Sequence, residues 1–544
     1  MELFLRPTSA ATEPFVGDVS VEARRDDLPS GGSVDWSGQW VAEFEAADGD
    51  LYWIVVDDGP PLLDPSCRDL VMTPDGPRSV IRGAWAARAQ GAPLGDAPIV
   101  YEIHVKGFGG TYRGCIDHLD HVAAMGVSVI ELMPVHPFDD TENYWGYMPL
   151  VWGAVHRGYA DDGSRAAEEL AELVGAAHDR GLHVWLDVVF NHTGEDGPAH
   201  PTLSLRGFDK AHLYRHHLDG RPFDDSGCGN DIDPGHPYVR HLVIEALDRL
   251  ADLGVDGFRF DLASLLSRDG GGLVDLITEW GEGRGVALVA EPWDLGAYQV
   301  GHGWPWPSWW QWNDRFRDDV RGFLRGEPGL VHAIRQRVQG SPDLFGPHGD
   351  QRSLNFVTAH DGLTMHDLTT LTSDRHHSWD CGPVLRVQQI KNYFTLLLLA
   401  QGGAMWVMGD EFGRTQHNHD NPYDIDGPLT WVDWAAAGQW RELTEFVGAL
   451  VGLRRRIQAG SVGELEAMRF YGIGPHIDEG FSSHSLAWCQ GDFYVMVNAW
   501  WQPLTFTVQE PGEWDVELAT AQPIIGPQGH ALVPRSIVVL GRSG

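Results

Sequence analysis

The chain has 544 residues, of which 43% are hydrophobic and 10% aromatic. These values fit a folded protein of several domains, because a single hydrophobic core rarely grows beyond about 250–300 residues. The formal net charge of -38 at pH 7 repels nucleic-acid phosphates and anionic membrane surfaces, so we expect a neutral ligand and neither nucleic acid nor membrane as a partner.

The cysteines point to the compartment. They are odd in number, scattered, and without the CxxC spacing of a zinc or redox site, which favours a reducing compartment. The N-terminal residues show no charged segment followed by an apolar run, and no later segment is long and apolar enough to span a membrane. We therefore predict a cytoplasmic protein. The cysteines are Cys67, Cys115, Cys228, Cys381 and Cys489.

The first part of the chain, residues 1–92, contains short alternating runs at 39–44 and 51–56, separated by Gly, Asp and Pro. Alternation between such turn residues is typical of short strands. We predict a small N-terminal β-sandwich.

From Ile99 onward the pattern becomes strand followed by helix, repeated over about 350 residues. Such alternation predicts an α/β fold, a (β/α)8 TIM barrel, over residues 93–457. The predicted strands are 99–105, 127–133, 182–190, 257–261, 286–290, a sixth near 309–312, 353–358 and 404–408. The predicted helices include 115–125, 237–253, 384–400 and 440–456.

Two further segments complete the predicted organisation. Residues 191–236 form a long insertion after the third strand, rich in His, Asp and Gly, and loops of this length usually carry function. From residue 458 to 544 short strands return, at 493–497, 504–508 and 537–540. We predict a C-terminal β-sandwich there.

Two carboxylates end neighbouring strand-like segments. The strand period of two puts Arg259 and Asp261 on one face, so that the guanidinium keeps Asp261 ionised, as a nucleophile requires. Glu291 follows the apolar run 286–290 and precedes Pro292-Trp293, a desolvating setting that raises a carboxyl pKa and retains a proton. The pair therefore predicts the catalytic core of a retaining glycosidase. The plainer alternative, capping and solubility at strand ends, carries even weight for either residue alone.

Four segments at the ends of predicted strands, taken in order, resemble the α-amylase superfamily, glycoside hydrolase family 13. They are Asp187-Val188-Val189-Phe190-Asn191-His192, Arg259-Phe260-Asp261, Glu291 and His360-Asp361. The resemblance implies that Asp261 is the nucleophile, Glu291 the general acid/base and Asp361 a third carboxylate that stabilises the transition state. It implies sugar binding by Tyr147, Asp187, His192, Arg259, Trp293 and His360.

Longer stretches resemble the bacterial glycogen debranching enzyme and isoamylase branch of this superfamily. They include residues 143–147, 227–230, 290–294, 312–315, 378–382 and 409–416. The resemblance implies retaining hydrolysis of α-1,6-glucosidic branch linkages in glycogen, limit dextrin or amylopectin. It also implies an N-terminal domain similar to family 48 carbohydrate-binding modules, and a branched α-glucan as partner.

The sequence leaves other functions open. The segments 362–377 and 417–423 depart from the debranching enzymes, and both shape the expected subsites, so branch length and the ratio of hydrolysis to transfer are open. An α-1,4-acting hydrolase or transglycosylase of the same superfamily, including a trehalose-releasing one, would use the same carboxylates. The third interpretation is a glycan-binding protein whose active site is catalytically inactive.

Two side-chain groups have both a structural and a functional interpretation. Five tryptophans in the stretch 304–312 could line outer sugar subsites or pack in the core. The histidines at 376–377 and 417–419 fit no zinc template, and no EF-hand spacing supports calcium, so we expect no metal and no cofactor. The oligomeric state is open.

Overall fold

The computed structural model describes residues 2–6, 46–56, 59–92, 94–95, 97–195, 201–459, 468–526 and 529–542. The chain forms two compact units. The first comprises Met1–Pro93, His104–Leu119 and Glu131–Trp309, and the second comprises Leu94–Ile103, Asp120–Ile130 and Trp310–Gly544. The predicted domain boundaries at residues 92 and 458, and a separate insertion at 191–236, stay predictions.

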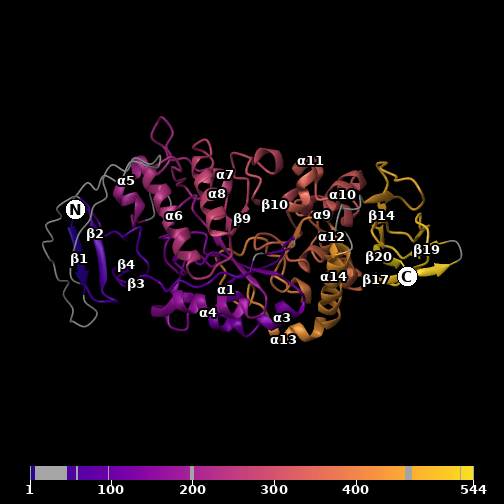
Figure 1. The fold of residues 1–544 in the computed structure, drawn as a ribbon, viewed down its shortest axis with the longest axis horizontal. Helices are drawn as coiled ribbons and strands as arrows, with labels where there is room; N and C mark the ends of the chain where they lie inside the picture. The colour runs from indigo at the N-terminus through magenta and orange to yellow at the C-terminus, as the bar shows by residue number, and fades with distance from the viewer. Residues whose placement is uncertain are drawn as a thin grey trace. The chain divides into compact units, whose positions relative to one another are not determined.

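Eight strands form a closed barrel in the order β10-β11-β12-β5-β6-β7-β8-β9, which confirms the predicted (β/α)8 fold (Figure 1). The sixth strand begins one residue after the predicted position, at Trp310. The strands are β5 (Ile99–Ile103), β6 (Val129–Leu132), β7 (His183–Val188), β8 (Gly257–Phe260), β9 (Ala287–Ala290), β10 (Trp310–Asn313), β11 (Ser353–Phe356) and β12 (Gly403–Val407).

The barrel strands are short and almost wholly buried. Strands covered on both faces carry continuous apolar runs, which is why they could be read from the sequence. Neighbouring strands such as β7 and β8, and β8 and β9, are parallel, because a helix returns the chain between them. Their carboxyl ends therefore meet at one edge of the barrel.

The predicted helix at 115–125 is wrong in one respect, because the structure has two short helices there. The amide of His118 donates to the carbonyl of Cys115 at 3.1 Å, a tight i to i+3 turn that ends the first helix. The helices are α1 (Val105–Gly109), α2 (Tyr112–Ile116), α3 (Leu119–Ala124), α4 (Ala166–His178), α5 (Leu205–Leu213), α6 (Pro237–Ala251), α7 (Ala263–Leu266), α8 (Gly272–Arg284), α9 (Asp314–Arg325), α10 (Val331–Val338), α11 (Pro342–Phe345), α12 (Gly382–Leu399), α13 (Trp434–Ala437) and α14 (Arg441–Ala459).

At the N-terminus, four antiparallel strands form a sheet in the order β1-β2-β4-β3. The predicted strand at 39–44 lies outside the described residues. The amide of Leu63 donates to the carbonyl of Leu203 at 2.7 Å, and Ser66 donates to Glu245 of α6 at 2.9 Å, so the segment between β2 and β3 is joined to the rest of the first unit. The strands are β1 (Glu2–Arg6), β2 (Leu51–Val55), β3 (Leu70–Thr73) and β4 (Gly76–Val80).

Two C-terminal sheets confirm the predicted C-terminal sandwich. Tyr494 and Val538 of the larger sheet and Phe506 and Leu532 of the smaller one belong to a single buried cluster. Within the second unit, α10 lies beside β14 and α12 beside β20 (Figure 1). The larger sheet is β13 (Arg469–Tyr471), β14 (Ser485–Gln490), β15 (Phe493–Asn498), β20 (Ser536–Arg542) and β17 (Trp514–Ala519), and the smaller is β16 (Leu504–Phe506), β19 (Gly529–Leu532) and β18 (Ile524–Gly526).

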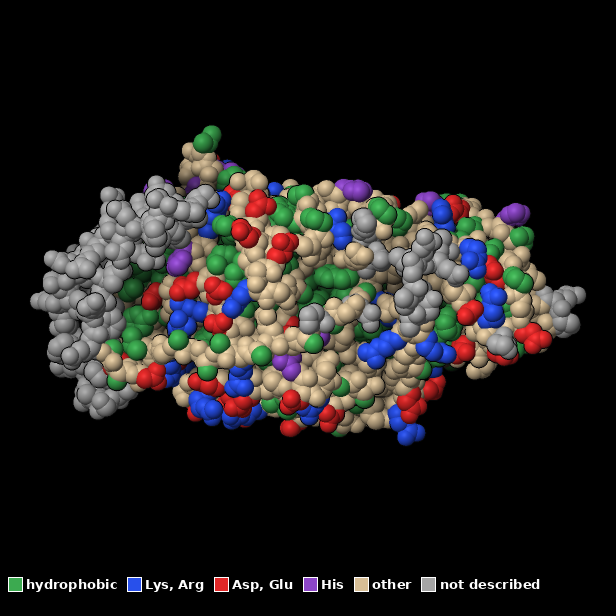
Figure 2. Space-filling view, in the orientation of Figure 1, with side chains coloured by type: hydrophobic (Ala, Val, Ile, Leu, Met, Phe, Trp, Pro, Cys, Tyr) green, Lys and Arg blue, Asp and Glu red, His purple; other side chains and the backbone are tan. Residues whose placement is uncertain are grey.

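Two further features are the distribution of charge on the surface and the length and apolarity of the helices. On the face drawn in Figure 2, acidic and basic side chains are interspersed, and basic side chains form no broad patch among the residues described there. Within the described part of the chain, no helix is long and apolar enough to cross a membrane.

Candidate active site

The register of β7, β8 and β9 brings polar side chains together at the carboxyl end of the barrel. Asp187 on β7 pairs with Arg259 on β8, and Phe260 pairs with Ala290 on β9. Asp261 and Glu291 are the next residues after these last pairs, so they leave adjacent strands at the same level. Parallel strands in this register place both carboxylates at one edge, as predicted from the sequence.

Arg259 is the centre of the site. Its Nη1 lies 2.9 and 2.8 Å from the two carboxylate oxygens of Asp187 and 3.0 Å from Oδ1 of Asp261. Its Nη2 lies 3.0 Å from Oε2 of Glu291. The guanidinium is 1% exposed. One buried cation thus contacts three carboxylates, including the two that the sequence singled out for catalysis.

Burial and charge act in opposite directions on this cluster. Burial alone would lower the pKa of Arg259, but the charges of Asp187, Glu291 and Asp261 hold it well above its usual value. Burial raises the pKa of Asp187 to about 6, against the opposing effect of Arg259 and with a further increase from the charge of Asp261. At neutral pH the guanidinium is therefore charged and Asp187 is ionised.

Asn191 fixes the orientation of Asp261. Its side-chain amide donates to Oδ2 of Asp261 at 2.8 Å and to the carbonyl oxygen of the same residue at 2.7 Å. With Arg259 on Oδ1, both carboxylate oxygens of Asp261 accept hydrogen bonds. These contacts fix the direction in which the carboxylate of Asp261 faces.

Glu291 is held by the backbone of Leu262, the residue that follows Asp261. The amide of Leu262 donates to Oε2 of Glu291 at 2.8 Å. Leu262 has φ 40° and ψ 50°, a left-handed conformation that non-glycine residues seldom adopt and that often marks a functional position. Glu291 is 6% exposed, which agrees with the predicted desolvated setting. Its retention of a proton stays a prediction.

Tyr147 and His192 border the same cluster. The hydroxyl of Tyr147 donates to Asp187 at 2.5 Å. One ring nitrogen of His192 contacts Oδ1 of Asn191, and the other lies 2.6 Å from the carbonyl of Tyr147. Both partners are acceptors, an arrangement that favours the doubly protonated ring, the imidazolium.

The pKa of His192 agrees with this charge. Burial alone would lower it, but Cys228, Asp261 and the bond to Tyr147 raise it to about 9. A direct hydrogen bond from His192 to a sugar hydroxyl would require one of its two protein contacts to be exchanged.

His360 and Asp361 follow β11 in the second unit. His360 is oriented by Glu102 of β5, whose Oε1 lies 2.7 Å from Nδ1 of the ring. Asp361 is exposed. Burial lowers the pKa of Arg317, but its bond to Asp318 and the charge of Asp361 raise it above its usual value. The charge of Asp361 therefore lies close enough to Arg317 to interact with it.

The tryptophans after β9 differ in burial. Trp304, Trp309 and Trp312 are at most 1% exposed, so the core interpretation holds for these three. Trp306 is partly buried and donates to Asp275 at 2.7 Å. Trp293 is also partly buried, and its backbone pairs with Tyr298 in an isolated bridge. Among the described residues, Trp293 takes no part in the hydrogen bonds around Arg259.

Three residues of the site had no role assigned from the sequence. Asn191 precedes His192, and an Asn beside a predicted site His is the signal that could have indicated it. Glu102 is an acidic residue inside a buried strand, which is itself unusual. Leu262 carries no sequence signal, because a left-handed conformation is unexpected for a leucine.

Across the ranges that the structure describes, no group of three or more His, Cys, Asp and Glu side chains is arranged to hold a metal ion. His376 instead contacts Asp420 at 2.8 Å, and His377 contacts Glu327 at 2.9 Å. These histidines link loops to one another.

Comparison with known proteins identifies relatives of this chain. Residues 44–203 match the family model "Alpha amylase, catalytic domain". The chain is 35% identical over 454 residues to the "Glycogen operon protein GlgX homolog" of Mycobacterium tuberculosis, which covers 72% of this chain and 61% of the relative. It is 36% identical over 425 residues to the "Glycogen debranching enzyme" of Klebsiella pneumoniae, covering 68% and 63%, and 35% identical over 414 residues to the chloroplastic "Isoamylase SU1" of Zea mays, covering 62% and 52%.

Solved structures share the fold. A pullulanase from Anoxybacillus sp. LM18-11, complexed with maltotetraose, has a TM-score of 0.80 at 22% identity and covers 100% of this chain and 84% of its own. A pullulanase from Bacillus acidopullulyticus has a TM-score of 0.78 at 20% identity and covers 99% and 72%. The chain spans between 52% and 63% of the length of the three curated relatives named above.

Proposed function

Because the chain belongs to the α-amylase superfamily, glycoside hydrolase family 13, we propose that it is a retaining glycoside hydrolase acting on α-1,6-glucosidic branch linkages. Its substrates are glycogen, limit dextrin or amylopectin. The observation that carries the proposal is the single buried Arg259 that contacts both Asp261 and Glu291. Two carboxyl groups on one guanidinium lie close together, as the double displacement of a retaining enzyme requires.

In the first step, a carboxylate oxygen of Asp261 attacks the anomeric carbon while Glu291 gives its proton to the leaving glycosidic oxygen. The bond from carbon to the leaving oxygen breaks, and a glycosyl ester of Asp261 forms. In the second step, Glu291 takes a proton from water, and the water oxygen displaces Asp261. Two inversions at the same carbon leave the product with the α configuration.

The remaining residues support these two steps. Arg259 and Asn191 fix the orientation of the Asp261 carboxylate through their contacts with both of its oxygens. The ring of Tyr147 stacks on the sugar being cleaved, because a C–H face of a sugar packs on an aromatic plane. Asp187 holds the hydroxyl of that ring.

His192, Trp293, His360 and Asp361 complete the proposed substrate site. The positive charge of His192 lies beside the nucleophile. Glu102 fixes the ring of His360, and Asp361 binds sugar hydroxyls and stabilises the positive charge that develops at the anomeric carbon. The proposed reaction uses side chains of the chain alone.

The α-1,6 specificity rests on the relatives. Proteins named glycogen debranching enzyme and isoamylase are 35–36% identical to this chain, and this identity exceeds that of the structurally similar pullulanases. The free cysteines support action in a reducing compartment such as the cytoplasm. The strongly negative chain favours a neutral glucan and disfavours nucleic acid and anionic membranes.

The proposal is tested by incubating the protein with a branched limit dextrin and, separately, with linear maltooligosaccharides, using Asp261→Asn as the blank. Released chains are resolved by length. Linear chains freed only from the branched substrate support the proposal and give the preferred branch length. Cleavage or rearrangement of the linear substrate would move the protein to the α-1,4-acting or transglycosylase class, and no reaction with either would contradict an active enzyme.

A further inference from the structure

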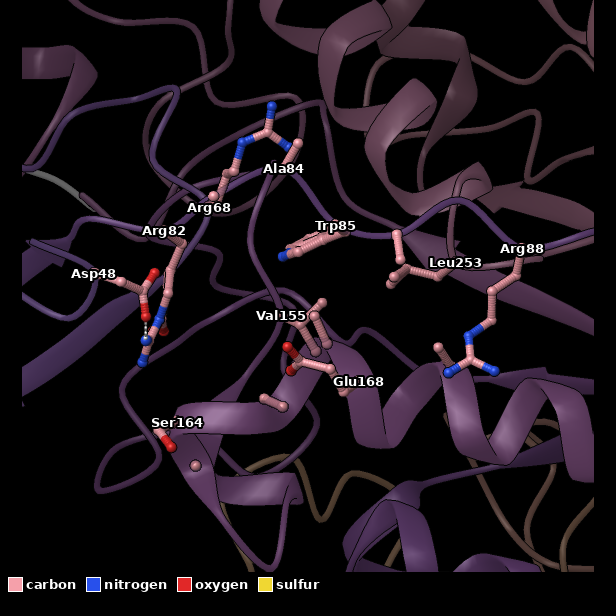
Figure 3. A pocket seen from close by; sticks show the side chains of 17 residues that line it. Asp48, Arg68, Arg82, Ala84, Trp85, Arg88, Val155, Ser164, Glu168 and Leu253 are labelled. Carbon is pink, nitrogen blue, oxygen red and sulfur yellow. Dashed lines mark hydrogen bonds and ion pairs between the residues drawn. The ribbon is translucent and has the colours of Figure 1, made fainter.

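A cavity of about 360 Å³ lies where the segment that follows β4 crosses the start of α4 (Figure 3). None of the proposed catalytic or substrate-binding residues lines it. Its volume falls in the range of small-molecule sites, about 300–1,000 Å³. Leu253, Val155 and alanines of α4 contribute apolar surface, and Trp85 spans the cavity, with its indole nitrogen toward the side where Arg82 lies (Figure 3).

The polar groups around Trp85 balance in charge. The lining contains the arginines Arg68, Arg82 and Arg88 and the carboxylates Asp48, Asp69 and Glu168. Arg82 is paired with both Asp48 and Asp69. Among the described residues, Arg68, Arg88 and Glu168 form no ion pair. The cavity therefore offers an aromatic plane, unpaired donors and an unpaired acceptor with no excess of either charge.

Such a lining fits a neutral polyhydroxylated ligand. Because the three arginines and three carboxylates of the lining balance, a phosphate gains no net attraction there, and an apolar ligand would leave charged groups desolvated. A sugar ring places its C–H face on an aromatic plane and exchanges hydrogen bonds with arginine and carboxylate through its rim hydroxyls.

The walls of the cavity are preformed. Asp69 accepts from Nε and Nη2 of Arg157, both at 2.7 Å, and from Nε of Arg82 at 2.9 Å. The amide of Arg88 donates to the carbonyl of Asp252 at 2.8 Å. A site whose walls are fixed by such contacts loses little conformational entropy on binding.

A second cavity, of about 330 Å³, shares Arg68, Ala84 and Trp85 with the first and extends along α6. Its other lining residues include His241 and Glu245. Trp85 thus stands between two adjoining hollows, which together exceed the space needed for one sugar ring. This arrangement fits a chain of sugar units that crosses the tryptophan.

We propose that these two hollows form a second, non-catalytic binding site for an unbranched α-glucan chain, with Trp85 as its stacking platform. The choice of an α-glucan rests on the proposed function. Binding one outer chain there would hold a branched particle on the enzyme while another of its branches occupies the barrel. Simultaneous binding at two points raises the effective concentration of the second chain.

The test uses the full chain in an Asp261→Asn background, which prevents turnover, and titrates it calorimetrically with maltoheptaose. We expect two binding events, one of which is lost on Trp85→Ala, weakened by Glu168→Ala and retained with Trp85→Phe. Glu168 is exposed on α4, so its substitution leaves the fold intact. Trp501→Ala, at a 54% exposed tryptophan, is the matched control and should bind as the background does.

Rates on the catalytically intact chain give the second readout. With Trp85→Ala, the apparent KM for glycogen should rise about tenfold, as expected from the loss of one aromatic stacking contact. The rate on a short, singly branched oligosaccharide should not change. Unchanged titrations for Trp85→Ala, or an equal loss with Trp501→Ala, would overturn the site. If no debranching occurs but Trp85-dependent maltoheptaose binding persists, the proposed function fails and the glucan site stands.

Discussion

Arg259 combines two tasks that one lysine could not perform. Its two terminal nitrogens lie on different carboxylates, Nη1 on Asp187 and Asp261 and Nη2 on Glu291. A planar guanidinium fixes the directions of these bonds, whereas an ammonium is a single point of charge. The distance between the two carboxyl groups proposed to be catalytic therefore depends on the shape of this side chain.

Replacing Arg259 with lysine should keep the positive charge and remove the planar geometry of the guanidinium. We expect Arg259→Lys to lower activity about 1,000-fold and the free energy of unfolding by about 3 kcal/mol, because at least one buried carboxylate loses its partner. Activity assays and denaturant titration check both values. Arg221→Lys, whose parent side chain is 75% exposed and pairs with Asp219, is the control. Near-normal activity in Arg259→Lys would show that geometry at this residue is unimportant.

The left-handed conformation of Leu262 aims its amide at Glu291. Glycine adopts this conformation without strain, whereas a β-branched residue resists it. We expect Leu262→Gly to retain activity within about threefold and Leu262→Val to lose at least about tenfold, through displacement of the amide from Glu291. Leu265→Val, in the helical backbone of α7, is the control for volume. Equal activity of the glycine and valine variants would contradict a positioning role for this backbone.

The sequence predicted the charged residues of the site better than the groups that orient them. Asp261, Glu291 and Arg259 follow from strand period and strand ends, and the structure places all three in contact. Glu102 and Leu262 escaped notice because their roles depend on tertiary neighbours. Burial of the tryptophans after β9 was also undecidable, since a tryptophan near a barrel edge serves core and subsite equally well.

At the scale of elements, Asp410 joins the end of β12 to the segment that carries His360 and Asp361. Its carboxylate contacts the hydroxyl of Thr358 and accepts from the amide of Met365 at 2.9 Å. Burial raises the pKa of Asp410 to about 7, above the value of about 3.9 for an unfolded aspartate. Between these values the folded protein keeps a proton that the unfolded chain has lost, so this residue makes the free energy of unfolding fall as pH rises from about 4 to 7.

We therefore expect Asp410→Asn, which is neutral at every pH, to be more stable than the parent by about 2–4 kcal/mol at pH 8 and nearly equal to it at pH 4. Denaturant titrations at the two pH values measure the difference. Asp380→Asn, an aspartate in an exposed loop, should change neither. A constant difference across pH would exclude the buried proton.

Most barrel elements were predictable because each strand is a short run of buried, mostly apolar residues, whereas most of the helices between them are longer. The break between α2 and α3 was not, because it depends on a single backbone turn at His118. The start of α14 at Arg441 instead of residue 440, and of β10 at Trp310, show that the ends of elements are less determined by local sequence than their existence.

At the scale of the whole molecule, the N-terminal sheet is attached through a buried carboxylate, Asp69. Asp69 of the N-terminal segment binds Arg157, which lies between β6 and α4. We expect Asp69→Asn to lower the free energy of unfolding by about 2 kcal/mol, since the amide cannot accept both guanidinium bonds. Faster limited proteolysis of the first 90 residues should accompany it. Asp75→Asn, exposed in the same sheet, is the control, and equal behaviour of the two variants would contradict attachment through Asp69.

The central claim is that Asp261 and Glu291 hydrolyse α-1,6 linkages with retention of configuration. The most direct measurement is proton NMR of a branched limit dextrin during the first minutes of reaction. We predict that the anomeric signal of the α-1,6 linkage decreases, that α-1,4 signals persist, and that new reducing ends appear first as the α anomer before mutarotation. Initial appearance of the β anomer, or loss of α-1,4 signals with the α-1,6 signal intact, would contradict the account.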